Sequence, residues 1–286
     1  MSLDELYKIY LQHPSVQTDT RKLKKGDLYF ALKGPNFNGN SFAQQAIDKD
    51  AAYAIIDEQN FIINEKTIFV DNVLATLQNL ARHHRLQFNI PFIAITGSNG
   101  KTTTKELIHA VLSTTYKTYT TEGNLNNHIG VPLTTLKIKN DAEFAIIEMG
   151  ANHLGEIASY CTIAMPTHGL ITNLGKAHLE GFGSEEGIRK AKGELFDYLK
   201  LNNGTAFIMP DYKYLVEMAE GIQEIYTYGK KEADVVGNIL SADPLLEVEF
   251  VKGLRKKIKT NLVGNYNLPN VLAAVAVGRY FNVNDD

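Results

Sequence analysis

The sequence predicts an α/β fold in which a small mixed α/β domain precedes a central domain of the phosphate-loop type. Short, continuous apolar runs at residues 92–96, 144–148, 168–173 and 205–209 alternate with segments of helical periodicity. Strands of that kind are typical of parallel sheets covered by helices on both faces. The length of 286 residues fits about two domains, each large enough to bury a core. We therefore expect a mostly parallel sheet flanked by helices in the central domain.

The first domain begins with a helix and continues with short strands. Ser2 and Glu5 form a capping box for a helix that carries Leu6 and Tyr10 on one face, and Pro14 ends it. Strand-like runs follow at residues 27–32, 53–57 and 67–70, and a helical stretch lies near residues 41–48. A helix over residues 72–86 closes this part of the chain.

The domain boundary is predicted at the segment Asn89-Ile90-Pro91, because proline disfavours a helix at the residue before it. This gives domains of residues 1–88 and 89–286. Within the second domain, residues 233–263 alternate in polarity between turn signals, which predicts an antiparallel extension of the sheet. A last helix is expected over residues 267–280.

Composition excludes several classes of protein. The chain is 44% hydrophobic and 21% charged with a net charge of -3, and its interspersed charges predict neither a nucleic-acid surface nor a membrane patch. No apolar run approaches the roughly 20 residues of a membrane span. The N-terminal residues lack the pattern of a signal peptide, and Cys161 has no disulfide partner. We expect a cytoplasmic protein.

The segment TGSNGKT at residues 96–102 predicts a nucleotide triphosphate site. An apolar strand ends there and a helix begins, so backbone N–H groups and the helix dipole face a phosphate chain while Lys101 adds a positive charge. Gly97 and Gly100 allow close approach, and the Thr102 hydroxyl is a candidate Mg2+ ligand. The general pattern has four residues between its first glycine and GK[ST], whereas Gly97 lies only three positions before Gly100. The loop is a shortened variant.

Polar residues at the ends of other apolar runs are further candidates, because ligands of open α/β sheets bind beyond the carboxyl ends of the strands. Glu148 follows one run and is a candidate Mg2+ ligand. His178 lies in a glycine-bracketed loop, either as a metal or phosphate ligand or as an ordinary surface or core residue. The stretch 189–194 contains three cations, which are typical of a solvated helix face. The loop 121–132 is either an ordinary loop or a polar recognition loop.

In this order, the motifs resemble the Mur ligases, the ATP-dependent amide-forming enzymes of peptidoglycan precursor synthesis and hence of cell-wall biogenesis. The matching stretches are TGSNGKTTTKE, TEGNLNNHIGVPLT, EMGANHLGEI, TNLGKAHLEGFGS, KAKGE, NYNLPNVLAA and, in the first domain, TDTRKLKKGDLYFALKGPNFNGN. They span nearly the whole chain. Within the family, the resemblance is closest to the member that adds D-Ala-D-Ala to UDP-N-acetylmuramoyl-tripeptide.

The resemblance implies a catalytic and metal-binding set. Lys101 would be the phosphate lysine, Thr102 and Glu148 would hold one Mg2+ ion, and His178 a second. Lys192 of the KAKGE stretch would be carbamylated by CO2, which converts a cation into an anion that helps to fix the metals. For ATP, the expected binding residues are Gly97, Ser98, Asn99, Gly100, Lys101, Thr102 and Thr103 in the loop, with Asn267 and Asn270 near the adenine.

The resemblance also implies sites for the UDP-linked substrate. Asn124, Asn126 and Asn127 lie in a loop that resembles the muramoyl-substrate contact. Thr20, Arg21 and Asn38 match the uridine-nucleotide site. There the family more often has serine at position 20, and aspartate and histidine where this chain has Asn38 and Asn40.

The implied activity is ATP-dependent carboxylate–amine ligation through an acyl phosphate, in which no side chain acts as a nucleophile. The family has a further carboxy-terminal domain, whereas this sequence stops at Asp286, so we expect the chain alone to be an inactive monomer. Three alternatives stay open. The chain is a non-catalytic fragment that binds nucleotide and UDP-substrate, or another ligase of the superfamily such as a folylpolyglutamate synthetase, or a phosphate-loop kinase or switch protein.

Overall fold

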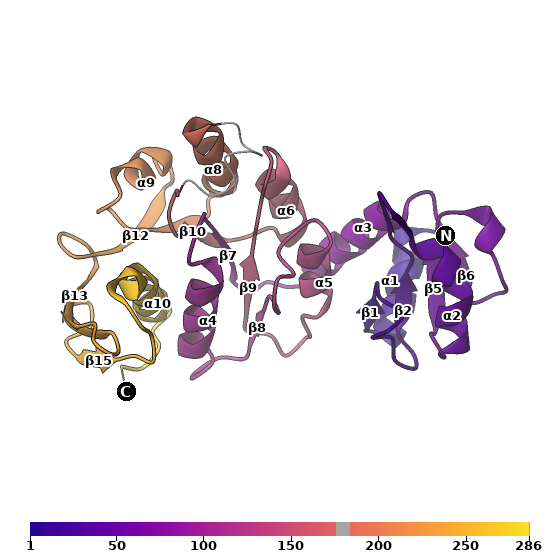
Figure 1. Cartoon of the computed structure of the whole chain (residues 1–286), viewed down its shortest axis with the longest axis horizontal. Helices are drawn as coiled ribbons and strands as arrows, with labels where there is room; N and C mark the ends of the chain where they lie inside the picture. Colours follow the sequence, from indigo (N-terminus) through magenta and orange to yellow (C-terminus); the bar gives the residue numbers. More distant parts are fainter. Residues whose placement is uncertain (176–183, 286) are drawn as a thin grey trace. The chain divides into compact units, whose positions relative to one another are not determined.

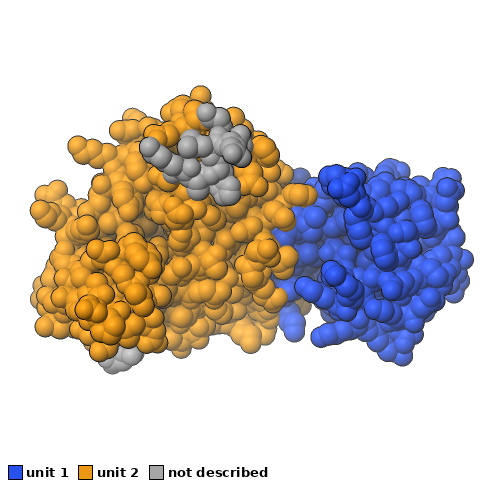
Figure 2. Space-filling view, in the orientation of Figure 1, with its two compact units in different colours: residues 1–89, 129–139 blue, residues 90–128, 140–286 orange. Residues whose placement is uncertain are grey.

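The computed structural model describes residues 1–175 and 184–285. It divides into two units, one of residues 1–89 with 129–139 and the other of residues 90–128 with 140–286 (Figure 2). The helix α5 (Gly130–Leu136) belongs to the first unit although its sequence neighbours lie in the second, because it packs against α3 (Val73–Arg85). Of the helices in the described ranges, none is both long and apolar enough to cross a membrane.

The first unit contains a parallel sheet of order β1-β2-β5-β6 (Figure 1). α1 and α3 begin where the sequence predicts, since Ser2 and Glu5 form the capping box of α1 and Asn72 caps α3 through Ala75 N–H. The elements are α1 (Leu3–Gln12), β1 (Val16–Gln17), β2 (Leu28–Phe30), β3 (Lys33–Gly34), β4 (Phe37–Asn38), η1 (Gly39–Phe42), α2 (Ala43–Asp48), β5 (Tyr53–Ile56), η2 (Gln59–Phe61) and β6 (Thr67–Phe69).

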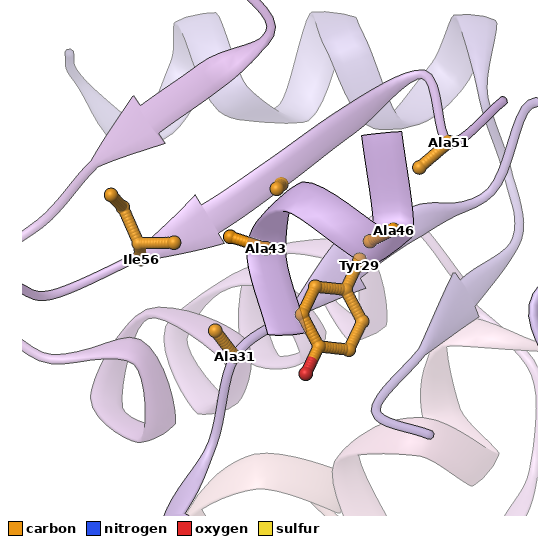
Figure 3. Close-up of a cluster of buried hydrophobic side chains, with 7 residues drawn as sticks. Tyr29, Ala31, Ala43, Ala46, Ala51 and Ile56 are labelled. Atoms are coloured by element: carbon orange, nitrogen blue, oxygen red, sulfur yellow. The ribbon is translucent and has the colours of Figure 1, made fainter. Parts of the chain in front are cut away.

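A cluster of mostly small side chains forms part of the core of this unit (Figure 3). Ala43 and Ala46 of α2 are fully buried against Tyr29 of β2 and Ile56 of β5. Alanines leave room for the helix to lie close to the strands, and the Tyr29 hydroxyl donates to the Gly39 carbonyl at 3.0 Å. The one polar atom of the cluster is therefore satisfied.

The second unit contains a sheet of order β15-β14-β13-β12-β11-β10-β7-β9-β8. The strands from β8 to β13 run parallel, and β13, β14 and β15 pair antiparallel. The α/β fold, the mostly parallel sheet and its antiparallel extension are thus confirmed. The strands are β7 (Phe92–Thr96), β8 (Thr118–Thr120), β9 (Phe144–Glu148), β10 (His168–Ile171), β11 (Thr205–Ile208), β12 (Glu224–Gly229), β13 (Val235–Ser241), β14 (Glu247–Lys252) and β15 (Lys257–Lys259).

Helices cover this sheet on both faces (Figure 1). The crossover through α4 leads from β7 towards β8, whereas those through α6 and α8 lead in the opposite direction along the sheet, so right-handed crossovers place them on opposite faces. The last helix, α10, packs against α4. The helices are α4 (Lys101–Leu112), α6 (Glu156–Ala164), α8 (Glu185–Leu201), α9 (Lys213–Met218), η3 (Asn265–Asn267) and α10 (Leu268–Tyr280).

The strand order brings three predicted strand ends together. β7 lies between β10 and β9, with Thr96 paired to Ile171 and Ile95 paired to Glu148. Parallel strands end at the same edge of a sheet, so the residues after β7, β9 and β10 meet there. That edge holds the candidate site.

Candidate functional site

The phosphate loop joins β7 to α4 and folds around its own lysine. Lys101 Nζ donates to the carbonyl oxygens of Gly97 at 2.8 Å and Ser98 at 3.2 Å. Burial lowers the pKa of Lys101 below its usual range, and the charge of Glu148 opposes that shift. Gly100 caps α4 with a φ of 77°, and Gly97 has a φ of 138°. A Cβ on Gly97 would lie 2.1 Å from Thr172 Oγ1, so only glycine fits there.

The loop is held by the residues that follow β10. Asn173 accepts from Ser98 N–H through its backbone carbonyl at 2.9 Å, and from Asn99 N–H through Oδ1 at 3.1 Å. Thr172 Oγ1 donates to the Asn99 carbonyl at 2.6 Å. Thr172 and Asn173 begin the TNLGKAHLEGFGS stretch at the end of an apolar run, but neither of them was assigned a role in the site from the sequence.

Glu148 is buried at the end of β9, only 1% exposed, with its two carboxylate oxygens in different situations. Oε1 accepts from Asn126 Nδ2 at 2.7 Å. Oε2 has no hydrogen-bond partner within the part of the chain that the structure describes. A buried carboxylate oxygen without a partner is unfavourable, and an oxygen of this kind is the ligand that Mg2+ prefers. The site therefore fits a divalent cation at Oε2.

Asn126 belongs to the loop predicted to contact substrate, and its carboxamide is engaged with Glu148. Its backbone carbonyl also accepts from Gly150 N–H at 2.8 Å. A Cβ on Gly150 would lie 2.9 Å from Asn126 Oδ1, so the glycine makes room for this amide. Asn124 and Asn127, the other two predicted residues of the loop, are exposed.

A fully buried lysine connects α4 with the start of the same loop. Lys105 Nζ donates to the Thr121 carbonyl at 2.5 Å, and Thr121 Oγ1 accepts from Glu148 N–H at 2.9 Å. The helix that carries Lys101 and the strand that ends in Glu148 are thus tied through Thr121. Lys105 was not among the predicted site residues.

Lys192 lies on α8 and is 2% exposed, so the solvated-face alternative is wrong for this residue. Its Nζ donates to the Ala151 carbonyl at 3.1 Å. Burial, and then the positive charge of Lys101, lower the pKa of Lys192 to about 8, against the opposing effect of Glu156 and Glu194. Lys190 of the same stretch is exposed. Burial next to a second cation therefore favours the neutral amine of Lys192 more than that of an exposed lysine.

A cavity of about 840 Å³ opens beside the phosphate loop. Asn99, Gly100 and Thr103 line one part of it, and residues 265–270 of η3 and α10 line another. Asn270 Oδ1 accepts from Thr104 Oγ1 at 3.0 Å, and Asn270 Nδ2 donates to Asn267 Oδ1 at 2.8 Å. The two predicted asparagines thus join α10 to α4 at the cavity wall.

The predicted residues of the first unit lie in separate hydrogen-bonded groups. Asn38 Oδ1 accepts from Asn40 Nδ2 at 2.9 Å, and Asn40 Nδ2 donates to Asp57 Oδ1 at 2.9 Å. Thr20 is buried and donates to Gln45 Oε1 at 2.7 Å. Arg21 is exposed and pairs with Asp19 at 2.8 Å. Asn38 and Asn40 thus form one polar group with Asp57, where the resembled pattern has aspartate and histidine.

His178, the predicted ligand of a second metal ion, lies outside the described residues. Among the residues that are described, no group of three or more His, Cys, Asp or Glu side chains is arranged to hold a metal ion. Of the predicted Mg2+ ligands that the structure describes, Glu148 lies at the sheet edge, Thr102 is exposed in the first turn of α4, and Lys192 lies on α8.

Comparisons with known proteins cover most of the chain. The model of the Mur ligase middle domain matches residues 95–278, and the model described as Mur ligase family, catalytic domain, matches residues 14–86. The UDP-N-acetylmuramoyl-tripeptide–D-alanyl-D-alanine ligase of Bacillus subtilis strain 168 is 37% identical over 94% of this chain and 59% of its own length.

Solved structures give the same result. A crystal structure of MurF from Acinetobacter baumannii matches with a TM-score of 0.84 and 32% identity, over 94% of this chain and 60% of that one. The MurF ligase of Thermotoga maritima in complex with ADP matches with a TM-score of 0.84 and 28% identity, over 96% of this chain and 65% of that one. The chain spans about three fifths of the length of the relatives it matches.

Proposed function

The chain belongs to the Mur ligase family, and from this membership we propose that it joins D-Ala-D-Ala to UDP-N-acetylmuramoyl-tripeptide at the expense of ATP. The observation that carries the proposal is the meeting of a phosphate loop and a buried carboxylate at one sheet edge, where β7 pairs with β9. The name of the Bacillus subtilis relative supports the choice of substrates. The ADP in the Thermotoga maritima structure supports the choice of nucleotide.

The proposed reaction begins with the substrate carboxylate. One of its oxygens attacks the γ-phosphorus of ATP. The bond between that phosphorus and the β,γ-bridging oxygen breaks, ADP departs, and the substrate becomes an acyl phosphate. The amine of D-Ala-D-Ala then attacks the carbonyl carbon, phosphate leaves with its electron pair, and the nitrogen loses a proton. Both steps need positioned reactants and a site that offsets negative charge.

The chain supplies that positive environment at the start of α4. The N–H groups in the first turn of the helix have no acceptors within the helix, and the helix dipole favours an anion there. Lys101 would exchange its bonds to the Gly97 and Ser98 carbonyls for phosphate oxygens. Glu148 and Thr102 would hold Mg2+, which neutralises phosphate charge when bound.

We further propose that Lys192 is carbamylated and that His178 holds a second Mg2+ ion. A lysine with a pKa of about 8 is partly neutral near neutral pH, and its nitrogen lone pair adds to the carbon of CO2 with loss of a proton. Mass spectrometry of the native protein in bicarbonate tests this. A mass increase of one CO2 that disappears in Lys192→Met supports the carbamate, and an unmodified Lys192 under these conditions contradicts it.

The remaining binding roles are also proposals. The cavity beside the loop, with Asn267 and Asn270 in its wall, suits the nucleoside of ATP. Thr20, Arg21 and Asn38 are proposed to bind the uridine nucleotide. Asn124, Asn126 and Asn127 are proposed to bind the muramoyl part, because their amide groups can form hydrogen bonds with a sugar. A monomer in the cytoplasm is the proposed state, and a lone cysteine agrees with a reducing compartment.

Release of ADP tests the activity. A protein of the full length of the relatives is incubated with ATP, Mg2+, UDP-N-acetylmuramoyl-tripeptide and D-Ala-D-Ala, and each component is omitted in turn. We expect ADP and the pentapeptide product only when all four are present, whereas these 286 residues alone are expected to be inactive. ADP release that does not depend on D-Ala-D-Ala, or that is faster with another amine, contradicts the assigned reaction and favours another ligase of the superfamily. Binding of ATP and UDP-substrate without ADP release favours the binding-only alternative for these 286 residues.

A further inference from the structure

We propose that Asn173 is a positioning residue that presets the phosphate loop, so that the backbone N–H groups of residues 100–103 bind the nucleotide phosphates and those of Ser98 and Asn99 do not. The inference rests on the proposed ATP site and gives a role to Asn173, which lies in the TNLGKAHLEGFGS stretch but was assigned no role there. It also specifies which part of the loop touches phosphate.

The contacts of Asn173 occupy two consecutive residues of the loop. Its Oδ1 accepts from Asn99 N–H at 3.1 Å, and its Nδ2 donates to the Asn99 carbonyl at 3.1 Å. Its backbone carbonyl accepts from Ser98 N–H at 2.9 Å. One residue at the end of β10 therefore binds both backbone groups of Asn99 and the N–H of its predecessor.

Thr172 reinforces the same point of the loop. Its hydroxyl donates to the Asn99 carbonyl at 2.6 Å, so that carbonyl accepts from both Thr172 and Asn173. The glycines on either side, Gly97 and Gly100, have φ values of 138° and 77°. Glycine adopts such angles readily but has no preference for them. The conformation of the loop is therefore imposed by the residues after β10.

The consequence concerns the N–H groups that remain for a ligand. In a loop of ordinary length, several N–H groups ahead of the helix surround the phosphates. Here the N–H groups of Ser98 and Asn99 point to Asn173, and the first helical bond runs from Thr104 N–H to the Gly100 carbonyl at 2.8 Å. The N–H groups from Gly100 to Thr103 take part in neither kind of bond, since they lie at the N-cap and in the first turn of α4. They are the donors that the helix dipole directs at an anion.

Asn173 also lines the cavity beside the loop, together with Asn99, Gly100 and Thr103. A change in its carboxamide therefore acts on the phosphate end of that cavity. Replacing Nδ2 by a carboxylate oxygen would set a negative charge against the Asn99 carbonyl and close to the nucleotide. The loop would lose its preset form while the core of the sheet stays intact.

The test uses Asn173→Asp in the 286-residue chain, with the affinity for ATP and for adenosine measured by calorimetry and by competition. At alkaline pH we expect ATP affinity to fall about tenfold or more, as for a lost hydrogen bond plus an unpaired group. Adenosine, which has no phosphate, should bind as it does to the unchanged protein. When the pH is lowered, the protonated carboxyl group regains a donor and an acceptor with the shape of the amide, so ATP affinity relative to the unchanged protein should recover.

Two further variants keep the inference falsifiable if Asn173→Asp does not fold. Thr172→Ala removes the other donor to the Asn99 carbonyl and should weaken ATP binding about threefold to tenfold, whereas Thr172→Ser keeps the hydroxyl and should restore it. The matched control is Asn202→Asp at the exposed end of α8, where the amide donates to the Tyr198 carbonyl at 2.8 Å. It should not change ATP affinity.

Equal ATP affinity of Asn173→Asp and the unchanged protein, or an equal loss for ATP and adenosine, overturns the inference. Failure of the unchanged chain to bind ATP is a different result, because it contradicts the proposed nucleotide site itself. The ATP affinity of the unchanged protein, measured in the same experiment, therefore shows whether the positioning role or the ATP site itself is wrong.

Discussion

The carboxamide of Asn126 donates to Oε1 of Glu148 at 2.7 Å, and the other carboxylate oxygen, Oε2, is buried without a partner among the described residues. The amide therefore leaves Oε2 as the oxygen that would face the proposed cation. Gly150 leaves the space in which the amide lies. The loop at residues 121–132, for which a substrate contact is proposed, therefore also holds a proposed metal ligand through Asn126.

Removing the Asn126 amide should weaken Mg2+ binding. In Asn126→Ala, Glu148 loses its orienting donor and has a second unpaired oxygen. Residues that hold a metal ligand in place typically change metal affinity by about 10–100-fold when they are replaced. The Mg2+ concentration that half-saturates ATP binding should rise accordingly. Asn140→Ala, at an exposed asparagine, is the control, and an unchanged Mg2+ requirement in Asn126→Ala contradicts the assignment.

The strands and helices could be predicted from local patterns. The apolar runs at β7, β9, β10 and β11 and the capping box of α1 are patterns of residues close together in the sequence, and the structure confirms them. β8, a short strand of partly buried polar residues, and β12, whose first residues are exposed, lack that signal and were not predicted.

The contacts that shape the site could not be predicted in the same way. The pairing of Asn173 with Asn99 follows from β10 lying next to β7, although the residues are far apart in the chain. The bond from Lys105 to Thr121 depends on how α4 lies on the sheet. The motif resemblance identified Glu148 and Lys192 as candidate site residues. It did not indicate that Asn126 donates a hydrogen bond to Glu148, or that burial lowers the pKa of Lys192.

Replacing Gly97 by alanine should weaken ATP binding. The new methyl group would lie 2.1 Å from Thr172 Oγ1, so the loop or the end of β10 has to move. Overpacking of this kind usually lowers stability by about 1–3 kcal/mol. Gly123→Ala is a matched control, because Gly123 also has a positive φ but a Cβ there meets no atom within 4 Å. Isothermal calorimetry with ATP should show a loss of at least about tenfold only for Gly97→Ala, and equal losses would contradict a steric cause.

Glu194 should stabilise the start of α6 from the neighbouring helix. Its Oε1 accepts from Gly155 N–H at 2.5 Å and its Oε2 from Ala158 N–H at 2.9 Å. Loss of a capping group typically costs about 0.5–2 kcal/mol. Urea denaturation of Glu194→Ala should show a decrease of that size in the free energy of unfolding. Asp197→Ala, which removes an exposed carboxylate from the same helix, should change it much less, and similar decreases in both variants would argue against capping.

The stability of the second unit should depend on pH through His168. Burial lowers the pKa of His168 from 6.5 to about 4, although Glu224 opposes the shift. The ring packs against Phe207, Tyr280 and Phe281. Between these two pKa values the unfolded chain binds a proton that the folded chain does not. The free energy of unfolding therefore rises with pH over this window, and the contribution is lost as the pH falls from about 6.5 towards 4.

The variant His168→Phe keeps an aromatic ring in the cluster and removes the titrating group. The slope of its unfolding free energy against pH should be smaller than that of the unchanged protein between pH 4 and 6.5, by at most about 1.4 kcal/mol per pH unit. Chemical denaturation at a series of pH values measures both slopes. His153→Gln, at an exposed histidine of the same unit, should leave the slope unchanged. Parallel curves for His168→Phe and the unchanged protein would show that this ring carries no pH-dependent stability.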